Sequence, residues 1–143
     1  MTSEGNRKMV ADDDYYSFLE TIAATDPRAT DLSLRVGASM RCDDYGAFGL
    51  AFKSAPDLRG SYERANRYAR VLTNVAAFEL EDTGDSALFH LHREGERRLG
   101  LRLSNESTIA AVAAISEEVS TATFQPIAVY FKHPALQPPA AYE

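Results

Sequence analysis

The fold is decided by residues 46–91, which read GAFGLAFKSAPDLRGSYERANRYARVLTNVAAFELEDTGDSALFHL. In this stretch Asp57 follows Pro56 and suits the N-cap of a helix, because its side chain can accept a hydrogen bond from a free backbone N–H. Asn74 is a suitable end for this helix, since Asn tolerates the left-handed backbone conformation. Between them, apolar residues recur at the three- and four-residue spacing of one helix face: Leu58, Tyr62, Ala65, Ala69 and Leu72.

After Asn74 the pattern changes to an alternation of apolar and polar residues, which is typical of a half-buried strand. Two such runs are separated by the turn sequence Thr83-Gly84-Asp85, so the pattern predicts a β-hairpin over about residues 75–92. Phe78 and Phe89 are expected to point from adjacent strands toward the preceding helix. The inward positions are Ala76, Phe78 and Leu80 in the first strand and Ala87, Phe89 and Leu91 in the second.

Three further helices and one further strand are expected outside this stretch. One helix follows the aspartates at residues 12–14 and ends before Pro27, and Thr30 can cap a second, short helix. A third is expected to start near Ser104, after a possible short strand at residues 101–103. The alternation of Ile127, Val129 and Phe131 with their neighbours predicts a strand over about residues 126–132.

The predicted class is therefore α+β, with several helices packed on a small, mainly antiparallel sheet made of the hairpin and the strand at about residues 126–132. The length of 143 residues suits a single domain. Residues 1–143 are accordingly treated as one domain, in which residues 1–11 form a polar tail that we expect to be mobile.

Residues 46–91 also resemble the N-terminal effector domain of bacterial AraC-type transcription regulators, in the arabinose-binding-like branch found in ornithine-utilisation and related regulators. Two flanking elements extend the resemblance to about residues 31–134: DLSLRVG at 31–37 and PIAVYFKHP at 126–134. Three motifs occur in the order found in the family, and this order supports the resemblance. The matching residues of the central stretch are Gly46, Gly49, Ser54, Ala55, Pro56, Leu58, Ala65, Arg67 and Tyr68.

The resemblance implies the sensory half of a transcription regulator. Such a domain binds a small-molecule effector, here unknown, and controls a DNA-binding region with two helix-turn-helix units that is absent from this chain. In the family a sequence like AAYE, at residues 140–143 here, opens a further helix, so the chain is expected to stop inside the effector domain. Regulators of this type often work as dimers, and a homodimer in the cytoplasm is expected.

The composition fits this interpretation. A net charge of −6 argues against duplex binding by this segment alone, because neutralising phosphates needs clustered Lys and Arg. The single cysteine, Cys42, excludes an internal disulfide and a multi-cysteine metal site, which fits a reducing cytoplasm. Cys42 is expected to be packed rather than reactive, because no His lies near it in sequence. No apolar run is long enough for a membrane span, and residues 1–14 lack the apolar core of a signal peptide.

Four residues are candidates for the effector site. Arg67 lies in a helix that also carries Arg64 and Arg70 at three-residue spacing, and an arginine can bind a carboxylate through two hydrogen bonds. Tyr68 could add a hydroxyl, and His90 and His92 could contribute from the hairpin if their face looks toward the helix. The alternative is that Arg67 pairs with Glu63 one turn away and that Tyr68 only packs.

No metal site and no cofactor are expected. His90 and His92 share one strand face, but a metal site needs at least a third ligand, and His133 is the only other histidine. No phosphate-binding loop, Gly-x-Ser-x-Gly elbow or spaced catalytic triad occurs, so the chain is interpreted as a non-enzyme. The alternative is a stand-alone small-molecule-binding or catalytic α+β protein that shares the fold.

Overall fold

The computed structural model describes residues 10–29 and 31–143. Most of the expected tail, residues 1–9, and the expected cap at residue 30 lie outside the described residues. The α-helices are α1 (Asp12–Thr25), α2 (Leu32–Ala38), α3 (Ala47–Lys53), α4 (Leu58–Tyr68) and α5 (Leu99–Val119), and the strands are β1 (Ala76–Asp82) and β2 (Ala87–Arg93). Short 3-10 turns lie at Pro27–Ala29, Cys42–Tyr45, Ala69–Val71 and Pro139–Tyr142. The predicted α+β class is confirmed.

The hairpin forms in the predicted register. Strands β1 and β2 pair antiparallel, with Phe78 opposite Leu91 and Leu80 opposite Phe89. The rings of Phe78 and Phe89 are diagonal neighbours on the inner face and stack with centroids 5.2 Å apart. Gly84 supplies the positive φ of 92° that the turn between the strands requires.

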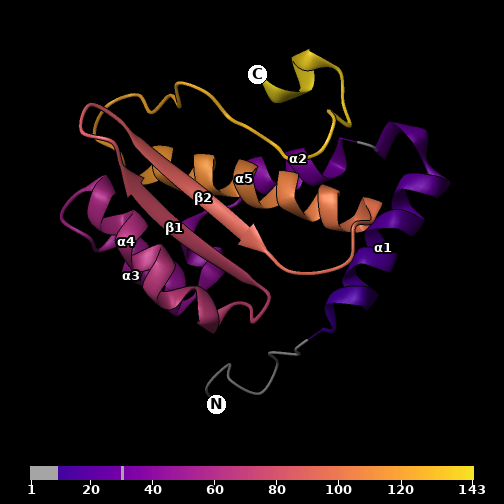
Figure 1. The fold of residues 1–143 in the computed structure, drawn as a ribbon, viewed down its shortest axis with the longest axis horizontal. Helices are drawn as coiled ribbons and strands as arrows, with labels where there is room; N and C mark the ends of the chain where they lie inside the picture. Colours follow the sequence, from indigo (N-terminus) through magenta and orange to yellow (C-terminus); the bar gives the residue numbers. More distant parts are fainter. Residues whose placement is uncertain (1–9, 30) are drawn as a thin grey trace.

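Helix α4 packs against the inner face of the hairpin (Figure 1), as predicted. The side chain of Asp57 caps it by accepting a hydrogen bond of 2.7 Å from the backbone N–H of Gly60. The ring of Tyr62 stacks on Phe89 with centroids 4.4 Å apart, and Ala65 is buried. The helix ends earlier than expected, at Tyr68, and a 3-10 turn then leads toward β1.

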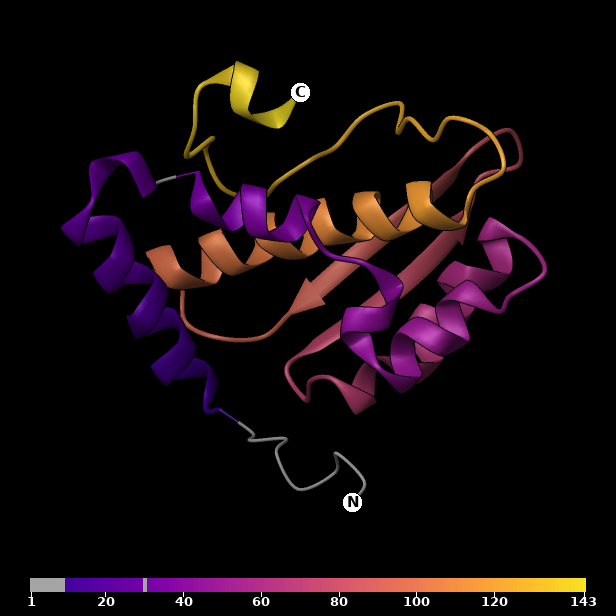
Figure 2. The same cartoon turned by 180° about the vertical axis from the view of Figure 1, so that it is seen from behind.

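Helix α5 runs behind the hairpin and is the longest element (Figure 1). From behind, α2 lies along it and α1 crosses one of its ends (Figure 2). Both contacts depend on glycine, because a Cβ on Gly37 would come within 2.2 Å of the Ser107 carbonyl oxygen, and a Cβ on Gly100 within 2.5 Å of Tyr16. The short strand expected at residues 101–103 does not form, because these residues lie in the first turns of α5.

The strand predicted over residues 126–132 does not form. The sheet within the described residues consists of β1 and β2 alone, and residues 126–132 have no regular structure. This segment runs back along α5 (Figures 1 and 2), and a helix offers no free backbone groups to an added strand. Ile127 is 94% and Tyr130 84% exposed, so the apolar alternation has no sheet to cover.

The main core lies between α3, α4, the hairpin and α5. Phe48, Phe52, Phe78 and Ile115 meet there, and Cys42 is fully buried beside them. Burial, followed by the neighbouring Glu118 carboxylate, raises the pKa of the Cys42 thiol to about 12. A thiol with such a pKa carries almost no thiolate at neutral pH, which agrees with the expected packed cysteine.

Candidate functional site

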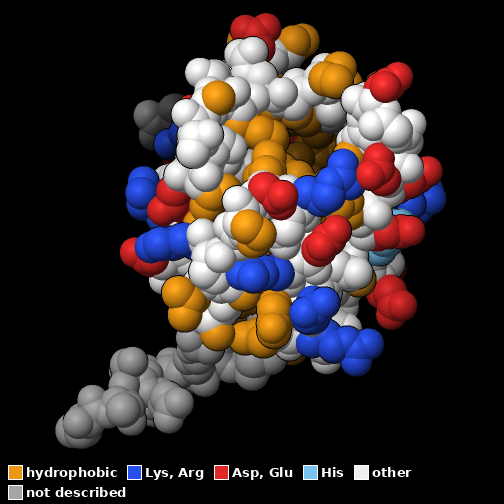
Figure 3. All heavy atoms as spheres, turned by 90° about the vertical axis from the view of Figure 1, so that its left-hand side faces the viewer, with side chains coloured by type: hydrophobic (Ala, Val, Ile, Leu, Met, Phe, Trp, Pro, Cys, Tyr) orange, Lys and Arg blue, Asp and Glu red, His pale blue; other side chains and the backbone are white. Residues whose placement is uncertain are grey.

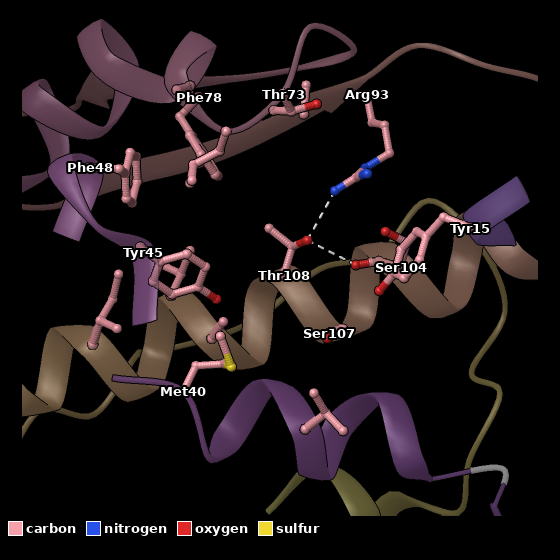
Figure 4. A pocket seen from close by; sticks show the side chains of 17 residues that line it. Tyr15, Met40, Tyr45, Phe48, Thr73, Phe78, Arg93, Ser104, Ser107 and Thr108 are labelled. Atoms are coloured by element: carbon pink, nitrogen blue, oxygen red, sulfur yellow. Dashed lines mark hydrogen bonds between the residues drawn. The ribbon is translucent and has the colours of Figure 1, made fainter. Parts of the chain in front are cut away.

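A cavity of about 420 Å³ lies between the inner face of the hairpin and α5. Strands β1 and β2 cover it from one side and α5 forms the opposite wall (Figure 4). Tyr15 of α1, Val36 of α2 and Tyr45 of the 3-10 turn before α3 contribute further walls. A cavity of this size falls in the range of sites that hold small organic molecules.

The cavity has an apolar end and a polar end. Phe48 and Phe78 lie at one end, with Met40 below them, and Arg93 and Tyr15 lie at the other (Figure 4). Most of the lining surface comes from apolar side chains, and among the described lining residues Arg93 alone carries a charge. The polar groups of the cavity therefore converge on one region of a mostly apolar space, which is typical of a small-molecule site.

Arg93 reaches the cavity because of its register in β2. It follows Phe89 and Leu91 at alternate positions, so its side chain leaves the strand on the same inner face. Its Nη2 donates a hydrogen bond of 3.0 Å to Thr108 Oγ1 of α5, and Thr108 Oγ1 in turn donates one of 2.9 Å to the Ser104 carbonyl. These two bonds hold the guanidinium in the position seen in Figure 4.

One donor of this guanidinium is left without a partner. The Nε–H of Arg93 is buried and has no hydrogen-bond acceptor among the described residues. Buried donors are paired in most proteins, and a charged donor is especially costly to leave unpaired. The Nε–H is thus a group that a ligand could satisfy.

Two tyrosine hydroxyls lie at the same cavity. Burial, followed by the Asp44 carboxylate, raises the pKa of Tyr45 to about 12. Burial also raises the pKa of Tyr15, although the nearby charge of Arg93 acts in the opposite direction. Both hydroxyls therefore stay neutral around pH 7 and can donate as well as accept a hydrogen bond.

The structure places the predicted residues Arg67 and Tyr68 elsewhere. They line a second, more open groove of about 470 Å³ between α3 and α4, together with Leu50 and Ala51. Arg67 is exposed and makes no ion pair with Glu63 or with any other described residue, and Tyr68 is 40% exposed. Their role in effector binding stays a prediction.

His90 and His92 lie on the outer face of the hairpin, opposite Phe89. Each ring Nε2 lies 2.9 Å from a carboxylate of the neighbouring strand, His90 beside Glu81 and His92 beside Glu79. They therefore do not join Arg67 and Tyr68 in one site, and a ligand role for them also stays a prediction. Within the described residues no group of three or more His, Cys, Asp or Glu side chains could hold a metal ion.

The face shown in Figure 3 offers little that a nucleic acid would select. On the face shown in Figure 3, acidic and basic side chains are interspersed, and neither sign dominates. Hydrophobic side chains line a hollow in the upper part of this face (Figure 3). In the part of the chain that the structure describes, no helix is long and apolar enough to cross a membrane.

Arg93 was missed by the sequence analysis although a signal was present. The alternation that marks Ala87, Phe89 and Leu91 as inward positions continues to Arg93. A charged residue at an inward position of a strand is unusual enough to indicate a functional site. Thr108 and Ser104 carry no comparable signal, because their proximity to Arg93 depends on how α5 packs under the hairpin.

The fold and the cavity define a small α+β binding domain. The family described as the arabinose-binding domain of AraC transcription regulators, N-terminal, matches residues 3–143, and the chain therefore belongs to this family. It is thus a ligand-binding regulatory domain by family, which is not an enzyme class. No curated protein and no solved structure matches the chain. The ornithine-utilisation branch stays a prediction.

Proposed function

We propose that this domain senses a small-molecule effector in the cavity between the hairpin and α5, and that binding controls a DNA-binding region outside this chain. The observation that carries the proposal is the cavity of about 420 Å³ with its polar groups gathered at Arg93. Membership of a family of regulator effector domains supports it. The arabinose in the family description does not identify a sugar as the ligand here.

Helix α5 connects the cavity to the C-terminal segment of the chain. It lines the cavity through Ser104 and Thr108 and carries the buried Glu106 between them. Glu106 Oε1 accepts a hydrogen bond of 2.8 Å from the Tyr142 hydroxyl and lies 3.1 Å from His133 Nε2. A ligand that shifts α5 would thus disturb the contacts that hold the segment from His133 to Tyr142. A regulator of this kind works only if the ligand binds one of two states better than the other.

Self-association is part of the proposal. Ile127, Val129 and Tyr130 are exposed on a segment without a strand partner, and such an apolar segment suits contact with a second copy. We propose a homodimer that acts in the cytoplasm, where the regulated DNA lies. Light scattering at high micromolar concentration tests the dimer, and a strictly monomeric mass would contradict it.

A thermal-shift screen of this chain against organic acids, alcohols, sugars and amino acids tests the proposed function. A compound at 100 times its dissociation constant should raise the free energy of unfolding by about 2.7 kcal/mol. The compound should be recovered chemically unchanged, whereas turnover would support the catalytic alternative. A hit that leaves the NMR signals of the cavity residues unshifted would contradict the cavity as the sensing site.

A further inference from the structure

We propose that the cavity selects an amphipathic monocarboxylate without an amino group. This inference rests on the proposed function and names the class of ligand. The carboxylate would accept a hydrogen bond from the Arg93 Nε–H, and the apolar body would lie against Phe48 and Phe78 at the other end of the cavity. Three features of the cavity support it: the unpaired cation, the lack of acidic side chains among the described lining residues, and the apolar lining.

Arg93 differs in its partners from the half-buried Arg64 and Arg98. Nη1 of Arg64 donates to the Ala51 carbonyl and to the Ser54 hydroxyl, each at 3.0 Å. Arg98 is held by Glu20, with Nε and Nη2 each donating to one carboxylate oxygen at 2.9 and 2.6 Å. Arg41, on the surface, pairs with Glu118. Arg93 has no carboxylate partner among the described residues, and its only hydrogen bond there goes to the neutral Thr108. Its buried Nε–H and its positive charge therefore both lack a counterpart.

A single negative charge is what this cavity can neutralise. Among the described lining residues there is one cation, Arg93, and neither a second Arg nor a Lys is available for a doubly charged phosphate. A carboxylate is monovalent at neutral pH and matches a guanidinium edge in shape. The neutral hydroxyls of Tyr15 and Ser104 lie in the same region and can donate to the second carboxylate oxygen.

The same lining excludes an ammonium group and a polyol. No Asp or Glu is among the described residues that line the cavity, so the ammonium of an amino acid would be buried without a counter-ion. A sugar needs donors and acceptors around its whole ring, but the hydroxyls of Tyr15, Ser104 and Thr108 gather at the polar end of the cavity. Ring hydroxyls that lie against Phe48, Phe78 and Ile115 would be buried without partners. The remaining class is an apolar body with one carboxylate at its end.

Matched probes test the proposal on this chain by isothermal titration calorimetry. Octanoate, octanol and octylamine share an alkyl body and differ in the head group, and 4-phenylbutanoate with its alcohol forms a second, aromatic pair. We expect the carboxylates to bind about tenfold or more tighter than the alcohols, and octylamine to bind weakest. Equal binding of carboxylate and alcohol would overturn the inferred class but would leave the cavity as a binding site.

Variants assign the effect to Arg93. Arg93→Gln should reduce carboxylate binding about tenfold or more and leave alcohol binding nearly unchanged, whereas Arg93→Lys should retain part of the preference. Arg97→Gln, at an exposed arginine that lines neither the cavity nor the groove between α3 and α4, is the control and should change neither. Thermal melts establish that each variant is folded. If Arg93→Gln does not fold, Arg93→Lys still tests the role of the guanidinium. A preference that survives in both Arg93 variants would overturn the proposal, as would failure of every carboxylate in a set of linear, branched and aryl-substituted acids.

These outcomes separate the inference from the proposed function. A neutral compound that shifts the NMR signals of the cavity residues would sustain the sensing site and remove the carboxylate class. A carboxylate that binds the Arg67 groove instead would remove both.

Discussion

Arg93 of β2 and Thr108 of α5 are joined by a hydrogen bond of 3.0 Å from Nη2 to Oγ1, across the gap between the hairpin and the central helix. This bond closes the polar end of the cavity and fixes the guanidinium there (Figure 4). Arg93 on the hairpin side and Thr108 on the α5 side thus connect the two walls of the cavity. The geometry of the site therefore depends on Thr108 as well as on Arg93.

We expect Thr108→Val to lower the free energy of unfolding by about 1–3 kcal/mol, because the Arg93 Nη2 loses its acceptor in a partly buried place. Thr123→Val, in an exposed position after α5, is the control and should stay within about 0.5 kcal/mol of the wild type. Urea denaturation followed by circular dichroism measures both. Equal midpoints for the two variants would mean that the Arg93–Thr108 bond contributes nothing to the fold.

The stacked phenylalanines of the hairpin allow a second test. Phe78 is 7% exposed and belongs to the main core, so Phe78→Ala should cost about 3–5 kcal/mol. Phe89 is only half-buried and should cost less. Chemical denaturation gives both values. A larger loss for Phe89→Ala than for Phe78→Ala would contradict the observed burial of the two rings.

The variant Gly49→Ala tests the close packing of α3 on the preceding turn. A Cβ at this position would lie 1.7 Å from the Cys42 carbonyl oxygen, so the backbone would have to move. Helix propensity alone predicts that Gly49→Ala stabilises the protein by up to about 1 kcal/mol. We expect the opposite sign, a lower melting temperature. The reverse change at an exposed site of the same helix, Ala47→Gly, measures the propensity term separately, and a stabilised Gly49→Ala would refute the contact.

The pair Glu20–Arg98 should make stability depend on pH. Hydrogen bonds from Arg98 and from the Gly100 backbone lower the pKa of Glu20 from 4.5 to about 2. A carboxyl whose pKa is lower in the folded state stabilises the fold fully above the unfolded pKa, and this contribution is lost as the pH falls toward 2.

Glu20→Gln should therefore be less stable than the wild type at pH 6, and the difference should shrink between about pH 5 and pH 2. Melting temperatures across this range measure it. Glu117→Gln, an exposed site on α5, is the control and should show a smaller change. A difference for Glu20→Gln that stays constant across the range would show that the carboxylate charge is not responsible.

The hairpin and its helix could be predicted because their patterns are local. The alternation around Phe78 and Phe89 and the cap at Asp57 each involve a few neighbouring residues, and the structure confirms both. The glycine of the family pattern, Gly49, also has a physical explanation, since only a residue without a Cβ fits against Cys42.

The full extent of α5 and the cavity could not be predicted in the same way. Helix α5 is covered by α1, α2 and the hairpin, so its buried residues do not form a single stripe, and its start at Leu99 was not recognised. The cavity joins residues from Tyr15 to Ile115, and that closeness depends on tertiary packing. The alternation at residues 126–132 indicated a strand, but a strand also needs an adjacent edge, which α5 does not provide.

We propose that the effector occupies the cavity between the hairpin and α5. Ala76 and Ala77 give a matched test, because they are neighbours on β1 with side chains on opposite faces, and only Ala76 lines the cavity. Isothermal titration of a ligand found by the screen compares Ala76→Leu with Ala77→Leu. We expect Ala76→Leu to fill space and to weaken binding about tenfold or more, equivalent to about 1.4 kcal/mol or more, while Ala77→Leu binds like the wild type. Wild-type affinity in a folded Ala76→Leu variant would contradict it.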